Sequence, residues 1–591
     1  MKRFLKYTLA TIVGIIVTSV LFFGIGFIIL SVIISAQNKP MDIAENSVFM
    51  LKLNNPIVER DDNNPFSGIN LLNMEPSSEL GLNVLLENIE KAGEEENIKG
   101  IYLNPTYIQA GWGTIQEIRD ALLEFKETGK FIIAYSDIYS QKAYYLSSVA
   151  NKVYLNPEGM VEFVGLSSEV LFYKEAFEKL GVDVAVFRRG KYKGYAEPFM
   201  SNQLSDENRE QIDRFLSMMW NNVITDISDS RDLGPDFLNQ QANQLTTLKS
   251  AKHAVDAGLI DELKYKDEII NELKSMTGIE DEEKGLPVMT VRNMAKVPKQ
   301  RKTKGLAKDK IAVIYAQGAI LPGEGDVNNI GADRISKAIR KARKDDKIKA
   351  IVFRINSGGG SALASEIIWR EIKLASETKP VIASMGDVAA SGGYYVLSHA
   401  DTILAEPNTL TGSIGVVAML YNAKELFNEK LGISMDVVKT NESADLLNLL
   451  RPLSNSENQV IETFVDNAYE TFITHVADGR GLSKNFVDSV GQGRVWNALD
   501  AKKLGLVDQI GYIDDAVNIA AEKANIDTYR ITELPVLEDP LVRFMKKLSR
   551  EVRTNAVKKE LGFFYKYYQK LKNLQNYHGI QARMPYEIQI E

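Results

Sequence analysis

Three clusters of glycine and serine in the second half of the chain carry residue types that could support acyl-transfer chemistry. The first is Asn356-Ser357-Gly358-Gly359-Gly360-Ser361, the second is Ser391-Gly392-Gly393, and the third is Thr411-Gly412-Ser413-Ile414-Gly415. Consecutive glycines let backbone N–H groups point at an anion or a carbonyl oxygen. A serine at a helix N-terminus lies beside free N–H groups that stabilise a developing oxyanion. The pattern predicts a nucleophile at Ser391, although a helix-capping serine would look similar.

A phosphate cradle is the rival interpretation of the first cluster. The Gly-Lys-Ser/Thr ending of a P-loop is missing there, and the turn contains no G-x-G-x-x-G. On its own, a glycine-rich turn is as often structural as functional.

No histidine is a good candidate for the base that would activate Ser391. His399 follows Ser391 by eight residues, about 12 Å along one helix, which is too far for a hydrogen bond. A lysine can serve instead if burial lowers its pKa. The segment 188–199, RRGKYKGYAEPF, offers Lys193 and, as an alternative, Lys191. A basic surface loop would have much the same composition.

The composition excludes several other classes of chemistry. The 591 residues include no cysteine and four histidines, which excludes disulfides, a thiolate nucleophile and Cys-ligated metals. The chain is 45% hydrophobic and 25% charged, as expected for a globular protein with a large core. Its net charge of −8 argues against nucleic acid as the main partner. We expect no metal and no cofactor.

The chain repeats itself at an offset of 250 residues. Residues 97–104 (NIKGIYLN) correspond to 347–354 (KIKAIVFR), and 127–137 correspond to 377–387. At this offset Gln141 takes the place of Ser391, while 439–444 has no lysine at the place of Lys193. Each half therefore keeps what the other has lost.

Both halves alternate short β-branched runs with helical apolar spacing. Such alternation predicts βαβ units with right-handed crossovers and a mostly parallel sheet in each half. Residues 9–34 carry no charge and follow Lys2, Arg3 and Lys6, which predicts an uncleaved transmembrane helix with a cytoplasmic N-terminus. A removed signal sequence is the alternative. The expected organisation is a basic N-terminus (1–8), an anchor (9–35), a first domain (47–290), an exposed basic linker (291–310), a second domain (311–535) and a helical C-terminal extension (536–591).

The combined motifs resemble a known family over nearly the whole chain. Tyr-Lys-x-x-x-Glu-Pro-Phe, Asn-Ser-x-Gly-Gly-Ser, Ala-Ser-Gly-Gly-Tyr and Leu-Thr-Gly-Ser-Ile-Gly are together similar to the long, duplicated form of signal peptide peptidase A, in serine peptidase family S49. The resemblance implies an α/β architecture of tandem ClpP/crotonase-like domains behind the anchor. The family usually has proline where this chain has Gly358, which would loosen the turn.

The resemblance also implies residue roles. Ser391 is the expected nucleophile, Lys193 its general base and Ser413 the hydroxyl that orients the lysine. The expected oxyanion donors are the N–H groups of Gly392 and Gly359. Expected substrate-binding residues are Asn356, Ser357, Gly360, Gly412 and Ile414.

The function implied is that of a membrane-anchored Ser-Lys endopeptidase that degrades signal-peptide remnants. Its partners would be hydrophobic peptides, the membrane and further copies of itself in a homotetramer or another homo-oligomer. It would lie in the bacterial inner membrane with its body outside the cytoplasm. A crotonase-type acyl-CoA enzyme and a non-catalytic membrane scaffold are the alternatives.

Overall fold

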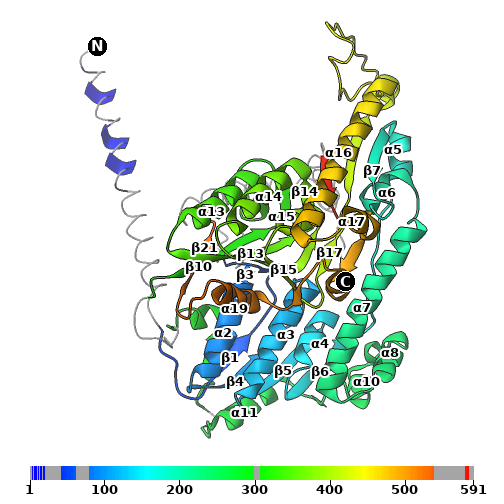
Figure 1. Cartoon of the computed structure of the whole chain (residues 1–591). Coiled ribbons are helices and arrows are strands. Elements are labelled where there is room, and N and C mark those ends of the chain that lie inside the picture. The colour runs from blue at the N-terminus through cyan, green and yellow to red at the C-terminus, as the bar shows by residue number, and fades with distance from the viewer. Residues whose placement is uncertain are drawn as a thin grey trace.

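The protein has a mixed α/β fold of two lobes, stacked one above the other in Figure 1. The computed structural model describes residues 41–61, 79–281, 283–298, 307–537 and 580–584, with scattered positions between 3 and 21. Helix α2 (Leu82–Glu94) of the first lobe matches α13 (Ala332–Lys344) of the second, at the same offset of 250 residues. The duplication and the mixed α/β fold are confirmed, whereas the ClpP/crotonase superfold stays a prediction.

The first lobe is built on a six-stranded sheet in which every pair is parallel. Its order is β8 (Glu262–Leu263), β6 (Lys152–Val161), β5 (Phe131–Tyr139), β4 (Ile98–Leu103), β1 (Ser47–Leu51) and β9 (Val288–Thr290). Helices α2, α3 (Trp112–Glu127) and α4 (Gln141–Ser147) belong to the core on one face, and α11 (Lys266–Thr277) covers the other. The remaining elements are β2 (Ile57–Val58), β3 (Leu80–Gly81), α5 (Lys174–Leu180), α6 (Glu197–Met200), α7 (Asp206–Arg231), α8 (Pro235–Asn243), α9 (Thr246–Lys249) and α10 (Ala251–Asp256).

The second lobe is built on an eight-stranded sheet that is parallel except at its β17–β19 edge. The main order is β19 (Val495–Asn497), β17 (Leu410–Gly412), β15 (Val381–Ala390), β13 (Ile348–Ser357), β10 (Lys310–Gln317) and β21 (Arg530–Leu534). Strand β16 (Thr402–Ala405) lies beside β15, and β20 (Gln509–Ile510) lies beside β16. Only Lys349 and Asn356 of β13 are not buried, as expected for a strand covered on both faces. The helices are α13, α14 (Ala362–Ser376), α15 (Gly392–Leu397), α16 (Asn455–Arg480), α17 (Lys484–Val490), α18 (Ala498–Lys503) and, on the opposite face, α19 (Ile513–Lys523).

A third sheet joins the lobes. Its order is β12 (Asn329–Gly331), β11 (Ala319–Leu321), β14 (Gly359–Ser361), β22 (Ile580–Arg583), β18 (Val416–Asn422) and β7 (Asp183–Arg189). First-lobe strand β7 pairs antiparallel with second-lobe strand β18 over seven residues, from Arg189 opposite Val416 to Asp183 opposite Asn422. This pairing carries the end of β7, and the loop that follows it, onto the second lobe.

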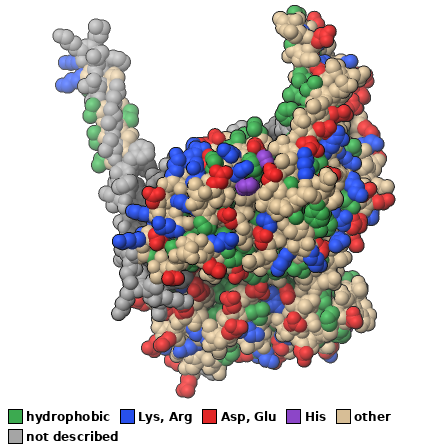
Figure 2. All heavy atoms as spheres, viewed as in Figure 1, with side chains coloured by type: hydrophobic (Ala, Val, Ile, Leu, Met, Phe, Trp, Pro, Cys, Tyr) green, Lys and Arg blue, Asp and Glu red, His purple; other side chains and the backbone are tan. Residues whose placement is uncertain are grey.

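A buried ion cluster also fixes the lobes to each other. Arg354 of β13 is fully buried and contacts carboxylate oxygens of Glu59 (2.7 Å), Glu117 (3.2 Å) and Glu406 (2.5 Å). Glu59 and Glu117 come from the first lobe. With three carboxylates around one guanidinium, burial raises the pKa of Glu117 to about 7 and also raises that of Glu406. Further acidic side chains lie where α2, α3 and α19 meet along the lobe boundary (Figure 2).

The structure bears on three segments whose character was predicted from the sequence: the linker, the C-terminal extension and the anchor. The basic segment 291–310 is not a fully exposed linker, because α12 (Val291–Met294) packs on the first lobe and buries Met294. The expected helical C-terminal extension 536–591 lies mostly outside the described residues, and within it Ile580–Arg583 form a strand. The expected anchor 9–35 falls mostly outside the described residues, among which no helix is long and apolar enough to cross a membrane.

The Arg354 cluster predicts that stability falls as pH rises. Between about pH 4.5 and 7 the folded chain keeps on Glu117 a proton that the unfolded chain has released, so the free energy of unfolding decreases with pH in this window. One such proton contributes at most about 1.4 kcal/mol per pH unit. Urea unfolding of Glu117→Gln at several pH values should show a flatter dependence than wild type. Glu127→Gln, an exposed position on the same helix, is the matched control and should follow wild type.

Candidate active site

Ser391 occupies a strained turn between β15 and α15. Its backbone has φ 56° and ψ −117°, its N–H donates to Gly412 O at 2.7 Å, and its side chain is fully buried. Such conformations cost about 1–3 kcal/mol and persist where surrounding structure enforces them. The two following glycines are required by space, because a Cβ at Gly392 would lie 2.6 Å from Ser365 Oγ and one at Gly393 would lie 2.5 Å from Ser357 O. The turn therefore holds a serine where a helix begins.

Lys193 reaches Ser391 from the other lobe. It follows β7, at the start of a short 3₁₀ turn (Gly194–Ala196), and is fully buried. Gln492 and Gly493 pack against this loop. Tyr192 N–H donates to Gln492 O at 2.9 Å, and a Cβ at Gly493 would lie 2.7 Å from Lys193 Cβ, so only glycine fits there. The lysine and the serine thus meet within a single chain.

The lysine and two serines form one hydrogen-bonded group. Lys193 Nζ lies 2.6 Å from Ser391 Oγ, 3.0 Å from Ser413 Oγ and 3.0 Å from Ser413 O. No carboxylate of the described residues contacts the amine, and desolvation by burial holds the pKa of Lys193 well below its usual range. A neutral amine has two N–H donors and one lone pair, which match these three contacts if Ser391 supplies the hydroxyl proton. The arrangement suits a serine activated by an uncharged lysine.

Ser413 is held in place by its own backbone. It has φ 50°, and its N–H donates to Arg494 O at 2.6 Å. Arg494 in turn donates to Tyr192 Oη at 3.0 Å, so the turn 491–494 braces both Ser413 and the lysine loop. Sequence reasoning did not single out this turn, although its GQGR composition was a usable signal.

The glycine cluster before α14 differs from expectation in one residue. Gly359 has φ 95° and its N–H donates to Ser357 Oγ at 3.1 Å, so it is not directed at a substrate oxygen. Gly360, the next residue, lies opposite Ala582 in the β14–β22 ladder. At Gly358 a side chain would meet only Met584 Cβ, at 3.6 Å. The structure favours Gly360 over Gly359 as the second oxyanion donor beside Gly392.

Four of the five expected substrate-binding residues have other contacts. Asn356 Nδ2 donates to Glu59 and Asp387, and Ser357 Oγ donates to Gly318 O. Gly412 O accepts the Ser391 N–H, and Ile414 is buried in the second-lobe core. These residues support the site from behind. Of the five, only Gly360 lies on β14, the strand that borders the groove between β14 and β18.

The equivalent place in the first lobe is closed by a side chain. Gln141 Oε1 accepts the N–H groups of Val164 (2.8 Å) and Gly165 (2.9 Å), and its Nε2 donates to Gly165 O at 2.9 Å. At the 250-residue offset these partners correspond to Ile414 and Gly415. In the first lobe, the glutamine amide therefore forms hydrogen bonds with Val164 and Gly165. In the second lobe, the equivalent residues, Ile414 and Gly415, adjoin the lysine-serine group.

Comparisons with known proteins relate the chain to a family of peptidases. The sequence model of peptidase family S49 matches residues 124–280 and 373–527. The chloroplastic serine protease SPPA of Arabidopsis thaliana is 38% identical over 475 residues, covering 78% of this chain and 69% of that protein. Protease 4 of Haemophilus influenzae is 38% identical over 445 residues, covering 74% and 72%. A candidate signal peptide peptidase SppA of Enterococcus faecium is 31% identical over 240 residues, covering 40% and 68%.

The lysine-serine group predicts selective reaction with a fluorophosphonate probe. Ser391 should be the labelled residue, and Lys193→Ala should slow labelling at least about 100-fold, the loss typical of removing a general base. Lys191→Ala is the matched control, because Lys191 is exposed and stacks on the Tyr192 ring. Labelling followed by peptide mass mapping measures both effects. Equal losses in the two variants would exclude a specific role for Lys193.

Proposed function

The chain belongs to peptidase family S49 and is a serine peptidase, and we propose that it degrades apolar peptides, including signal peptides left in the membrane after secretion. The observation that carries the proposal is the buried contact of Lys193 Nζ with Ser391 Oγ, beside Ser413. A non-catalytic scaffold would not need to bury a lysine against a strained serine. A crotonase-type enzyme would not need the pair at all.

The geometry supports a Ser-Lys mechanism. Neutral Lys193 takes the proton of Ser391 Oγ as the oxygen attacks the scissile carbonyl carbon. The N–H groups of Gly392 and Gly360 would stabilise the oxyanion of the tetrahedral intermediate. The lysinium then protonates the leaving amine. Water, activated by the same lysine, hydrolyses the acyl-enzyme and restores both side chains.

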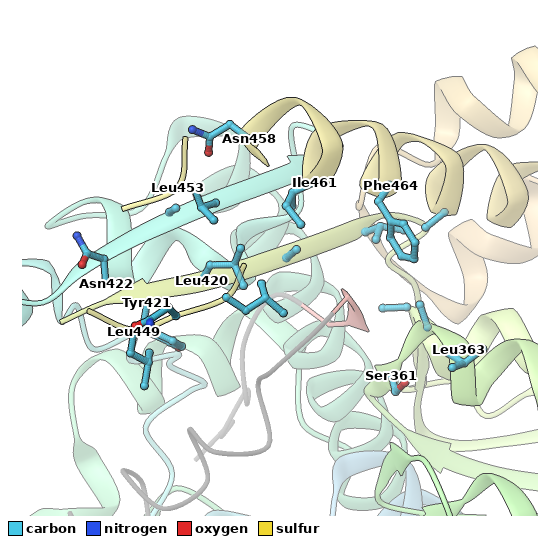
Figure 3. Close-up of a pocket in the computed structure, with 18 of the residues that line it drawn as sticks. Ser361, Leu363, Leu420, Tyr421, Asn422, Leu449, Leu453, Asn458, Ile461 and Phe464 are labelled. Carbon is cyan, nitrogen blue, oxygen red and sulfur yellow. The ribbon is translucent and has the colours of Figure 1, made fainter. Parts of the chain in front are cut away.

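An apolar cavity beside the site supports the choice of substrate. Its volume is about 900 Å³, and it lies between β18, α16 and the start of α14 (Figure 3). Apolar side chains from these elements and from the loop before α16 line it, among them Leu363, Leu420, Leu453, Ile461 and Phe464. Ser361 and Ala582 also line it, so the cavity opens onto the groove beside β14. A signal-peptide core, rich in leucine and similar residues, would fit such a wall.

Placement at the membrane rests on the sequence. The charge-free run 9–34 behind Lys2, Arg3 and Lys6 supports an anchor with a cytoplasmic N-terminus, a single crossing of the bacterial inner membrane and a catalytic body outside the cytoplasm. The name of the Enterococcus faecium relative agrees with signal peptides as substrates.

Assembly into a homo-oligomer such as a tetramer is supported by an apolar arm. Residues 431–449 extend beyond α16 in Figure 1 and expose several large apolar side chains. Val438 is 98% exposed, and Leu431 and Leu447 are more than half exposed. A second copy of the chain would cover these side chains.

Peptide hydrolysis tests the proposal. The full chain in detergent should cleave a leucine-rich, signal-peptide-like substrate, and Ser391→Ala should lower kcat/KM at least about 10³-fold, as expected for loss of a nucleophile. A peptide of equal length with aspartates in place of the leucines should be cleaved far more slowly, because the cavity would have to desolvate the charges. Liquid chromatography of the products measures both. Equal rates on the two peptides would contradict the apolar specificity, and undiminished turnover by Ser391→Ala would contradict the mechanism.

Activity should rise with pH. The base must be uncharged, so kcat/KM increases as free Lys193 loses its proton, with an inflection below the ordinary lysine value of 10.5. Lys193→Arg keeps a cation that does not deprotonate, and it should be inactive across the whole range. Initial rates from about pH 6 to 10 give the profile. A plateau already reached near pH 6, or a wild-type profile in the arginine variant, would argue against a lysine base.

A further inference from the structure

Asp387 joins the first lobe to the strand that carries the nucleophile. It lies on β15, four residues before Ser391. Its Oδ1 accepts the backbone N–H of Thr114 at 2.9 Å, and its Oδ2 accepts the Thr114 hydroxyl at 2.8 Å. Thr114 is buried and belongs to α3, which meets β15 across the lobe boundary (Figure 1). The Ser-Lys mechanism gives this carboxylate no chemical step, so its contacts need another explanation.

The contact with Thr114 caps helix α3 from outside its own lobe. At the 250-residue offset α3 corresponds to α14, where Ser361 is the N-cap residue and accepts the Ala364 N–H at 3.3 Å. The first-lobe equivalent of Ser361 is Gly111, which has no side chain to accept a hydrogen bond. Asp387 takes over this role and accepts the N–H at the same helical position. A carboxylate there satisfies a free N–H group and interacts favourably with the helix dipole.

Two glycines at the start of α3 leave the space that Asp387 occupies. A Cβ at Gly111 would collide with the Asp387 carboxylate. A Cβ at Gly113 would collide with Glu406 Oε2 and would lie 3.2 Å from Asp387 Oδ1. The start of α3 therefore fits closely against carboxylates of the second lobe.

Asp387 also holds an irregularity in the second-lobe sheet. The pairing of β13 with β15 is interrupted where residues 386–388 of β15 stand opposite Asn356 alone. The Asn356 side chain bridges the interruption, because its Nδ2 donates to Asp387 Oδ2 at 3.0 Å and its Oδ1 accepts the Val388 N–H at 3.2 Å. Such a bulge changes the direction of the strand that follows it.

Both catalytic turns begin directly after this bulge. Strand β15 continues to the turn at Ser391, and β13 continues through Ser357 to the glycines 358–360. A shift of Asp387 relative to α3 would therefore move the nucleophile and the oxyanion donors. The apolar cavity would change less, because β18, α16 and the start of α14 form it, whereas the Asp387 hydrogen bonds go to α3 and β13.

We propose that Asp387 is a positioning residue of the active site; this inference rests on the proposed Ser-Lys mechanism. Lys193 belongs to the first lobe and Ser391 to the second, so their contact depends on how the lobes dock. Asp387 fixes the docking at the bulge that precedes Ser391. Through Asn356 it passes the same constraint to the oxyanion turn.

Steady-state kinetics on the leucine-rich peptide test the inference. Asp387→Asn puts an amide nitrogen in place of an acceptor oxygen and should lower kcat about 10²-fold, the cost of misplacing reacting groups by about 1 Å. KM should stay within about twofold of wild type, because the cavity that binds the peptide is unchanged. Thr114→Val removes one hydrogen bond to the carboxylate and should lower kcat about tenfold. Thr114→Ser keeps the hydroxyl and should restore the wild-type kcat.

A double variant and a matched control show whether the effect is specific. Because Thr114→Val and Asp387→Asn remove the same contact, the double variant should be no slower than Asp387→Asn alone. Arg60→Ala is the control, since Arg60 also joins the lobes, through a 2.8 Å ion pair with Glu533, but at the β21 edge of the sheet. Its kcat should equal that of wild type. A loss of kcat in Arg60→Ala as large as in Asp387→Asn would overturn the specific role of Asp387.

Fluorophosphonate labelling of Ser391 separates this inference from the proposed substrate. Labelling needs the nucleophile and the oxyanion donors but no peptide, so Asp387→Asn should slow it by about the same factor as kcat. Wild type that is labelled but leaves the leucine-rich peptide intact contradicts the proposed substrate, and the labelling rates then decide the role of Asp387. Wild type that is neither labelled nor active contradicts both.

The positioning role has its own contrary results. Wild-type kcat and labelling in Asp387→Asn would overturn it, and so would a raised KM with unchanged kcat. If Asp387→Asn does not fold, the labelling rates and kcat of Thr114→Val and Thr114→Ser decide the question. Equal values in these two variants would overturn the proposal.

Discussion

The rest of the site depends on removing the Lys193 amine from water. Among the residues that the structure describes, no carboxylate would balance an ammonium in that position, and desolvation favours the neutral form that can accept a proton. Complete burial needs walls on every side, and no single lobe supplies them. The loop after β7 provides the lysine, β18 holds β7, and the turn 491–494 packs against that loop. The need to exclude water from the Lys193 amine thus explains why both lobes contribute to one site.

The duplication makes this division of roles possible. In the second lobe the turn after β15 carries Ser391, whereas in the first lobe Gln141 fills the same place with amide hydrogen bonds to Val164 and Gly165. The first lobe is consequently free to act as a support and as the donor of Lys193. The first lobe must hold Lys193 within hydrogen-bonding distance of Ser391. The buried contacts of Arg354 with Glu59 and Glu117 fix the first lobe against the second and so supply that constraint.

Sequence reasoning predicted the parts of the site that depend on local pattern. Ser391 and Lys193 stand in motifs visible in the sequence, Ser413 was assigned its role through the family resemblance, and the 250-residue repeat predicted the paired lobes. The assignment among the glycines was not predictable in this way, because Gly359 and Gly360 differ only in where their N–H groups point. That direction is set by pairing with β22, more than 200 residues later in the chain. Strand β22 itself is four residues long and has no periodicity to detect.

The same nonlocal pairing bears on how the groove can work. Strands β14 and β18 both have an edge facing the groove, and an empty groove would leave their backbone groups to water or to another extended segment. Backbone pairing is indifferent to side-chain identity, so it admits the chain's own Gln581 and Ala582 as well as a foreign peptide. Discrimination must then come from the cavity beside Ala582, where apolar contact adds affinity and a charge loses it. Under the proposed function the fold would separate the two tasks of a peptidase: β14 and β18 would hold any extended chain against Ser391, and the apolar wall would select which chains remain there.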